Sequence, residues 1–213
     1  QVTVPWSAAV SQERPNGLQW DQVPIWKDVL WPMSFKIAVG GCPNNCVKPD
    51  LNDIGIIGQR APQPTLAQCK ACGLCQPKKA CPIHAITQES RQQPVLHEEL
   101  CNRCGRCLHT CPFHVFDDSI DGCKIYLGGR WGKKIRHGQP MDKLFTSKEE
   151  VLSTVEKAIL LFRDQGLTGE RFADTIDRIG FTKVQQQLLA NTLLENKAAN
   201  LAAKKHLVGG ATC

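Results

Sequence analysis

Two cysteine-rich repeats, which together run from residue 69 to residue 111, constrain this chain more than any other feature. The first repeat reads CKACGLCQPKKACP and the second reads CNRCGRCLHTCP. In each repeat three cysteines are separated by two residues each, and a fourth cysteine stands directly before a proline. The eight cysteines are Cys69, Cys72, Cys75, Cys81, Cys101, Cys104, Cys107 and Cys111. This spacing is typical of the ligands of 4Fe-4S clusters.

The spacing also predicts how the eight cysteines pair. A tight loop with three cysteines can hold three irons of one cubane, so the fourth ligand must come from elsewhere, and the Cys-Pro of the other repeat supplies it. We therefore expect two crossed sets: Cys69, Cys72 and Cys75 with Cys111, and Cys101, Cys104 and Cys107 with Cys81. The paired repeats closely resemble the bacterial two-cluster ferredoxins. This resemblance implies two 4Fe-4S clusters and a role in electron transfer.

Other uses of cysteine fit the pattern less well. Zinc prefers four tetrahedral ligands from two separated pairs. A disulfide framework belongs to small secreted chains, whereas this chain has 213 residues and no recognisable signal peptide. Its twelve cysteines, most of them in metal-binding spacing, instead predict a reducing, cytoplasmic location. Cys123 and Cys213 lie outside every motif, and we expect a buried structural thiol and a free tail thiol, respectively.

Composition argues against two further classes of protein. The content of 42% hydrophobic and 22% charged residues is ordinary for a soluble globular chain. No apolar run reaches the roughly 20 residues that a transmembrane helix needs, so we expect no membrane span. The formal net charge is +6, but Lys and Arg are spread along the chain, so we expect no nucleic-acid partner.

Another cysteine motif lies upstream of the repeats, in the sequence FKIAVGGCPNNC. The apolar run from Phe35 to Val39 predicts a strand, and the glycine pair after it permits a tight turn that leads to Cys42 and Cys46. A second strand is predicted from Ile54 to Gly58. A glycine-bracketed turn with two cysteines is half of a metal site and needs two further ligands.

This strand, GCPNNC and DIGIIG together resemble the second half-motif of the sirohaem nitrite and sulfite reductases. The resemblance implies that Cys42 and Cys46 bind a third 4Fe-4S cluster, and that the Cys46 thiolate bridges this cluster to sirohaem at the catalytic centre. Residues 126–132 (YLGGRWG) resemble the glycine-rich strand of the family, and residues 169–180 resemble its C-terminal helix. A ferredoxin inserted between these strands is most similar to the C subunits of anaerobic sulfite reductases and to their dissimilatory relatives.

The resemblance implies an α+β fold, the C-terminal half of a sirohaem and 4Fe-4S reductase domain. The expected divisions are 1–64 with 119–182 for the reductase-like domain, 65–118 for an inserted dicluster ferredoxin domain, and 183–213 for a helical tail. In this family a C-x5-C ligand pair lies before the position of Cys42, where the present sequence has no cysteine.

Basic residues follow the glycine-rich segment. Arg130 and Lys133 are the leading candidates for cofactor contact, with Lys134, Arg136 and His137 beside them. They either face an anionic ligand, such as the carboxylates of sirohaem, or form a solvated loop. The sequence leaves both interpretations open.

The sequence pattern in the last third of the chain predicts three helices. Ser147 and Glu150 form the pattern of a capping box, which begins a helix that ends near Gly166. A second helix is predicted over residues 169–179 and a third over residues 182–205, where apolar residues recur at helical spacing.

Two hypotheses about function follow. The first is an iron–sulfur oxidoreductase component of a sirohaem-dependent sulfite or nitrite reductase, which passes electrons through two ferredoxin-type clusters to a sirohaem-coupled cluster. It implies a small inorganic anion as substrate, a redox partner that donates electrons, and a place in a hetero-oligomer. The second is a non-catalytic ferredoxin-like subunit of a larger redox complex that has lost sirohaem.

Overall fold

A four-stranded sheet with the strand order β1-β2-β5-β6 forms the centre of the molecule. The computed structural model describes residues 35–167 and 169–203, so the start of the predicted 1–64 segment and Cys213 lie outside it. The strands are β1 (Ile37–Gly40), β2 (Ile54–Pro62), β5 (Ser119–Leu127) and β6 (Gln139–Phe145). β1 runs parallel to β2, and the other neighbours are antiparallel. The two strands predicted on either side of GCPNNC are confirmed.

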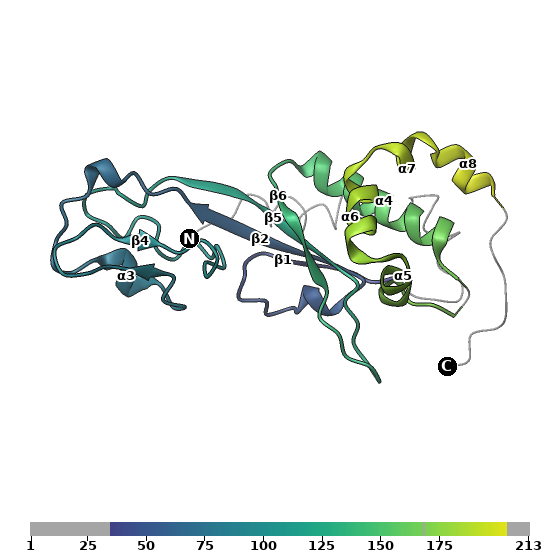
Figure 1. Cartoon of the computed structure of the whole chain (residues 1–213), viewed down its shortest axis with the longest axis horizontal. Coiled ribbons are helices and arrows are strands. Elements are labelled where there is room, and N and C mark those ends of the chain that lie inside the picture. The colour runs from purple at the N-terminus through teal and green to yellow at the C-terminus, as the bar shows by residue number, and fades with distance from the viewer. Residues whose placement is uncertain (1–34, 168, 204–213) are drawn as a thin grey trace, which may run out of the picture.

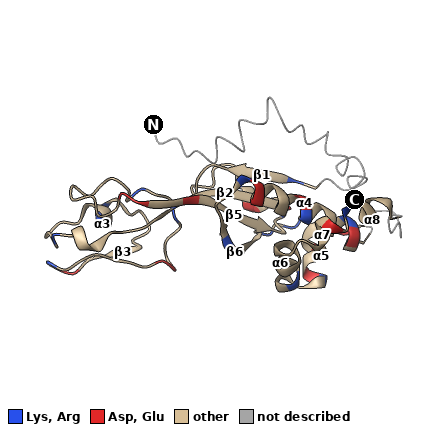
Figure 2. Ribbon diagram, turned by 90° about the horizontal axis from the view of Figure 1, so that it is seen from above, with Lys and Arg blue, Asp and Glu red and all other residues tan. Residues whose placement is uncertain are grey.

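The cysteine-rich segment leaves and rejoins the sheet at neighbouring points. β2 and β5 pair along their full length, from Ile54 opposite Leu127 to Pro62 opposite Ser119. Residues 63–118 extend from the end of this ladder and form the end of the molecule that lies away from the helices (Figures 1 and 2). The segment contains η3 (Leu66–Gln68), α3 (Gln76–Ala80), β3 (Ile86–Thr87) and β4 (Val95–Leu96). β3 and β4 are the short strands expected between the repeats.

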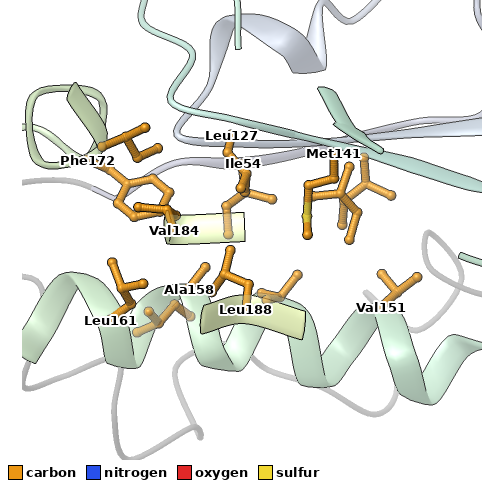
Figure 3. Close-up of a cluster of buried hydrophobic side chains, with 14 of the residues drawn as sticks. Ile54, Leu127, Met141, Val151, Ala158, Leu161, Phe172, Val184 and Leu188 are labelled. Carbon is orange, nitrogen blue, oxygen red and sulfur yellow. The ribbon is translucent and has the colours of Figure 1, made fainter. Parts of the chain in front are cut away.

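Helices cover one face of the sheet and form the main core with it. They are α4 (Lys148–Gln165), α5 (Phe172–Ile179), α6 (Phe181–Leu189), α7 (Thr192–Glu195) and α8 (Lys197–Ala202). Because strand side chains alternate between faces, Ile54 and Leu127 point toward α4, where they meet Ala158 and Leu161 (Figure 3). Each such large side chain contributes about 1.5–3 kcal/mol when it is fully buried.

The start of α4 follows the sequence prediction. The Ser147 hydroxyl accepts a hydrogen bond from the Glu150 backbone N–H at 3.4 Å, which satisfies one of the free donors of the first turn. The helix ends at Gln165, directly before Gly166. The predicted second helix begins later than expected, at Phe172, because Gly169 adopts a φ of 87° that a helix cannot accommodate.

The prediction of one long third helix is wrong, because this segment forms α6, α7 and α8. The chain leaves the helical path at Ala190 and turns again at Asn196. Asparagine side chains compete for backbone hydrogen bonds and favour such breaks. At the first break, the Asn191 side-chain oxygen accepts a hydrogen bond from the buried Lys157 ammonium at 3.0 Å. The breaks let Leu193, Leu194 and Leu201 pack against the main core.

The predicted glycine-rich strand also ends early. β5 stops at Leu127, and Gly128 turns the chain away with a φ of 76°. A Cβ on Gly129 would lie 2.2 Å from the Asp50 carbonyl oxygen, so this position requires glycine. Residues 128–138 consequently form a loop that rests against η2 (Pro49–Leu51).

The observed architecture is a mixed α+β fold, which agrees with the predicted fold class. Within residues 35–167 and 169–203, no helix has the length and apolar character needed to span a bilayer.

Candidate functional site

Four cysteines from both repeats come together around one cavity of the cysteine-rich segment. Cys69, Cys72 and Cys75 line a cavity of about 230 Å³ together with Cys111 of the second repeat. Val115 and Phe116, which are nearly inaccessible to solvent, form its apolar floor. Hereafter these four cysteines are called the distal set.

The other four cysteines gather nearer to the sheet. Cys101, Cys104 and Cys107 line a pocket together with Cys81 of the first repeat. Ile83 and Ile86 are among the apolar residues around them. We call these four cysteines the proximal set. The structure therefore groups the eight cysteines in the two crossed sets that the spacing predicts.

Backbone N–H groups point at the cysteine sulfurs in both sets. The N–H of Ala71 lies 3.4 Å from the Cys69 Sγ, and the N–H of Arg103 lies 3.4 Å from the Cys101 Sγ. Both donors have an unusual positive φ, 47° for Ala71 and 57° for Arg103. The N–H of Ala85 makes a further contact of 3.2 Å with the Cys81 Sγ. Hydrogen bonds to sulfur are one of the means by which proteins set the potential of iron–sulfur clusters.

Burial disfavours the free thiolates of these sites. Burial, together with the neighbouring charges of Cys101, Cys104 and Cys81, raises the pKa of the Cys107 thiol to about 12. Burial also raises the pKa of the Cys75 thiol, and the negative charges of Cys72, Cys111 and Cys69 contribute to this increase. Such thiols remain protonated at neutral pH, so iron must displace their protons when it binds.

The composition of both donor sets fits a cubane cluster. No group of three or more His, Cys, Asp or Glu side chains within the described ranges is arranged to hold one metal ion. Each set instead surrounds a pocket with four sulfurs, an apolar lining and backbone donors directed at sulfur. These features suit a 4Fe-4S cluster, which supplies one-electron transfer when it is bound.

The proximal set is attached directly to the sheet. The backbone N–H of Arg60, near the end of β2, donates a 2.8 Å hydrogen bond to the Arg103 carbonyl. Arg60 and Cys104 also form an isolated parallel β-bridge. The Arg60 guanidinium pairs with Asp121 of β5 at 3.1 Å. The loop that carries Cys101 and Cys104 is therefore positioned by two strands of the sheet.

Cys42 and Cys46 lie in the loop between β1 and η2. The side chain of Cys42 is half-buried, and Cys46 is exposed. Between them, Asn45 takes a φ of 57° and its backbone N–H donates to the Cys42 carbonyl at 3.3 Å. A Cβ on Gly55 of β2 would lie 2.4 Å from the Pro49 carbonyl oxygen, so this loop packs closely on the face of the sheet opposite the helices.

Asp50 joins this cysteine loop to the loop of residues 128–138. One carboxylate oxygen of Asp50 accepts from the Asn45 side-chain amide at 2.6 Å, and the other pairs with His137 Nδ1 at 2.6 Å. The Asp50 carbonyl also accepts from the Gly138 backbone N–H at 2.7 Å. Although burial raises the pKa of the Asp50 carboxyl, hydrogen bonds from Asn45 and His137 and the His137 charge lower it below its usual value overall.

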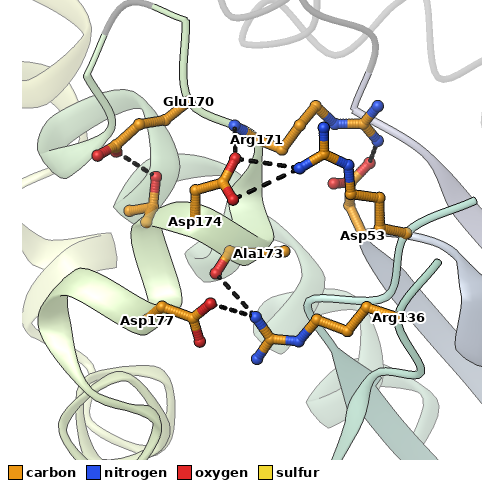
Figure 4. A network of polar contacts seen from close by, with 9 residues as sticks. Asp53, Arg136, Glu170, Arg171, Ala173, Asp174 and Asp177 are labelled. Atoms are coloured by element: carbon orange, nitrogen blue, oxygen red, sulfur yellow. Dashed lines mark hydrogen bonds and ion pairs between the residues drawn. The ribbon is translucent and has the colours of Figure 1, made fainter. Parts of the chain in front are cut away.

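The predicted cofactor contacts Arg130 and Lys133 differ in their surroundings. Arg130 is half-buried and its guanidinium lies 3.4 Å from a carboxylate oxygen of Asp174 in α5, whereas Lys133 is exposed. Arg136 pairs with Asp177 of the same helix and donates to the Ala173 carbonyl at 3.4 Å (Figure 4). Ion pairs with α5 thus hold the base of the loop, and its tip projects into solvent.

The segment GERF, at residues 169–172, has a positioning role. The Arg171 guanidinium lies 2.7 Å from the carboxylate of Asp53, which is 1% exposed (Figure 4). The same carboxylate oxygen accepts the Lys36 backbone N–H at 2.9 Å. Burial raises the pKa of the Asp53 carboxyl, while Lys36 and Arg171 counteract this shift. Arg171 therefore connects α5 to the strands that carry the Cys42 and Cys46 loop.

A cavity of about 400 Å³ lies between that loop and the proximal set. Its lining includes Pro43 and Asn45 on one side, Cys101 and Arg103 on the other, and Gln59 from the sheet. The structure thus brings the proximal set close to the loop that carries Cys42 and Cys46.

Sequence reasoning missed the residues that organise these sites. Nothing in the sequence marks Ala71 and Arg103 as backbone donors, because residues other than glycine rarely adopt a positive φ. The repeat offers one signal, since each residue stands two positions after the first cysteine of its repeat. Asp50 and His137 are far apart in sequence, and no local pattern indicates their contact.

The grouped cysteines and the α+β fold place the chain among the iron–sulfur proteins. Residues 21–197 match the family model described as the nitrite and sulphite reductase 4Fe-4S domain. The chain belongs to this family, as its resemblance to the sirohaem nitrite and sulfite reductases predicted.

Two curated relatives and one solved structure show where in this family the similarity lies. The chain is 30% identical over 159 residues to a coenzyme F420-dependent sulfite reductase of Methanocaldococcus jannaschii, which covers 74% of this chain and 25% of that protein. It is also 30% identical over 176 residues to the C subunit of the anaerobic sulfite reductase of Salmonella typhimurium, across 78% of this chain and 51% of that protein. The chain thus spans between a quarter and about half of the length of these relatives.

The crystal structure of dissimilatory sulfite reductase I has a TM-score of 0.52 with this chain and is 22% identical to it. The match covers 75% of this chain and 43% of that one. At this identity the similarity establishes the fold alone.

Proposed function

We propose that this chain is the electron-transferring component of a sulfite or nitrite reductase. The observation that carries this proposal is the grouping of eight cysteines around two pockets, one of which belongs to a loop attached to β2. The distal set would hold one 4Fe-4S cluster and the proximal set a second. Their order along the molecule gives electrons a path from the outer end toward the sheet.

The loop that carries Cys42 and Cys46 would receive these electrons. It lies across a single cavity from Cys101, and Asp50 fixes its conformation through Asn45. In this proposal Cys42 and Cys46 provide half of the ligands of a third cluster, with the Cys46 thiolate exposed for contact with sirohaem. Arg130 and Lys133 of the adjacent loop would face the carboxylates of that cofactor or the anionic substrate.

One feature of the sequence favours a second function, electron transfer without sirohaem. The sequence contains no cysteine before Cys42, so the two remaining ligands of a third cluster would have to come from outside it. Under this alternative the chain is a two-cluster relay within a larger redox complex, and the Cys42 loop is a structural remnant.

Anaerobic iron and sulfide analysis with an optical spectrum separates these functions. About twelve irons per chain together with sirohaem bands would support a site completed at Cys42 and Cys46. About eight irons without macrocycle bands would support the relay, and fewer than four would contradict both. Cys123→Ala is the matched control, because Cys123 is buried in the main core and its loss should leave the iron content unchanged.

A further inference from the structure

The outer end of the cysteine-rich segment has the features of a docking surface. Cys72 of the distal set is exposed, unlike Cys75 beside it. Two large apolar side chains, Leu74 and Phe113, line the same cavity as Cys72 and are 64% and 40% exposed. Exposed apolar groups around a functional cavity are characteristic of protein contact sites.

The first half of the cysteine-rich segment carries mostly basic charge. Between Leu66 and Leu96 the sequence carries four basic residues and one acidic residue, Glu89. All four basic side chains are exposed: Lys70, Lys78, Lys79 and Arg91.

Two hydrogen bonds place Lys78 beside the distal set. The Lys78 ammonium donates to the Gln88 carbonyl at 3.1 Å, and the Gln88 side chain donates to the Cys72 carbonyl at 3.0 Å. α3, which carries Lys78 and Lys79, lies at this end of the molecule in both views (Figures 1 and 2). We call the exposed Cys72, Leu74 and Phe113 with Lys70, Lys78 and Lys79 the distal surface.

We propose that the distal surface docks an acidic protein that donates single electrons to the distal set. This inference rests on the proposed function, because it requires a cluster at Cys69, Cys72, Cys75 and Cys111. The apolar pair Leu74 and Phe113 would form the centre of the contact, and the lysines would attract a negatively charged partner before contact is made. The loop of the proximal set is instead joined to β2, through the β-bridge between Arg60 and Cys104.

The proposed reaction needs no other reductant than the donor protein. One electron leaves the reduced cofactor of the donor and enters the oxidised cluster at the distal set, and no bond between heavy atoms forms or breaks. Electrostatic attraction should accelerate this reaction at low ionic strength, and added salt should slow it.

Stopped-flow reduction of the holoprotein by photoreduced flavodoxin, an acidic one-electron protein, tests the proposal. We expect the double variant Lys78→Glu/Lys79→Glu to lower the second-order rate constant about tenfold at low salt, and to remove most of its salt dependence. Leu74→Ser should weaken the complex without unfolding the protein, because this side chain is already 64% exposed. Lys183→Glu is the control, since this exposed lysine lies in α6 at the opposite end of the molecule.

Two further measurements distinguish docking from other effects of the lysines. Photoreduced deazaflavin, a small neutral reductant, should reduce the wild type and the double variant at similar rates. A slower reaction with both donors, together with a lower cluster potential, would mean that the lysines only tune the cluster, and would overturn the proposal.

The docking proposal would also be overturned if flavodoxin reduced the double variant and Lys183→Glu at equal rates. If the protein contains about eight irons and this result is obtained, only the docking surface is wrong. If the protein binds no clusters, the proposed function itself fails.

Discussion

The ion pair between Arg171 and Asp53 gives a demanding test of how the candidate site is supported. Arg171→Met keeps most of the side-chain volume and removes the guanidinium 2.7 Å from the Asp53 carboxylate. That carboxylate is 1% exposed, and its second oxygen has no hydrogen-bond partner among the described residues. The variant would leave a buried charge with only the Lys36 backbone N–H to stabilise it.

Removal of one partner from a buried ion pair typically costs about 3–5 kcal/mol. We expect the lower end, about 3 kcal/mol, because the Arg171 side chain is 21% exposed and the Lys36 hydrogen bond remains. Anaerobic urea denaturation followed by far-UV circular dichroism measures this loss. In a chain of this size it corresponds to a fall in the melting temperature of about 6–12 °C.

The double variant Asp53→Asn/Arg171→Met is the matched control. Its neutral amide can still accept the Lys36 N–H, so it should recover at least half of the lost stability. The deficit of Arg171→Met should also shrink as the pH falls, because protonation of Asp53 removes the unpaired charge. A loss below about 1 kcal/mol, or no recovery in the double variant, would refute the view that Arg171 compensates a buried carboxylate.

Two other predictions concern the cysteine sets and α5. Cys111→Ala should lower the iron content by about four per chain. Adding Cys69→Ala should cost no further iron, whereas adding Cys101→Ala should remove about four more, and the reverse result would disprove crossed ligation. The pKa of Glu170 is lowered to about 2, chiefly by hydrogen bonds from Arg178. The ionised Glu170 carboxylate therefore stabilises the fold fully above a pH of about 4.5, and this stabilisation is lost as the pH falls toward 2. Glu170→Gln should lower the free energy of unfolding by about 1 kcal/mol at pH 7 and by progressively less below pH 4.5. Urea denaturation at several pH values measures this difference.

The sequence predicted those features whose determinants are local. The spacing of the cysteines predicts the two crossed ligand sets, and the cysteines of each set line one pocket, while their ligation of clusters stays a prediction. The strands beside GCPNNC and the start of α4 at Ser147 were also predictable, since a short apolar run and a helix cap act within a few residues.

The remaining features depend on contacts between distant segments. The turn at Gly128 is required by the approach of Gly129 to Asp50, which no local pattern records. The break at Asn191 depends on the Lys157 ammonium of α4, so helical periodicity alone predicted a helix that was too long. The pairing of Arg130 with Asp174 likewise required the fold, and it shows why residue type could not distinguish a cofactor contact from a solvated loop.

The pairing of Pro62 with Ser119 has a consequence for how such a protein can arise. The two ends of the cysteine-rich segment meet as neighbours on adjacent antiparallel strands, a position that a tight hairpin could occupy equally well. Long insertions at such points cost little beyond the entropy of closing a loop. Evolution could therefore add or remove the whole cysteine-rich segment in a single genetic event, while the ladder of β2 and β5 kept its register.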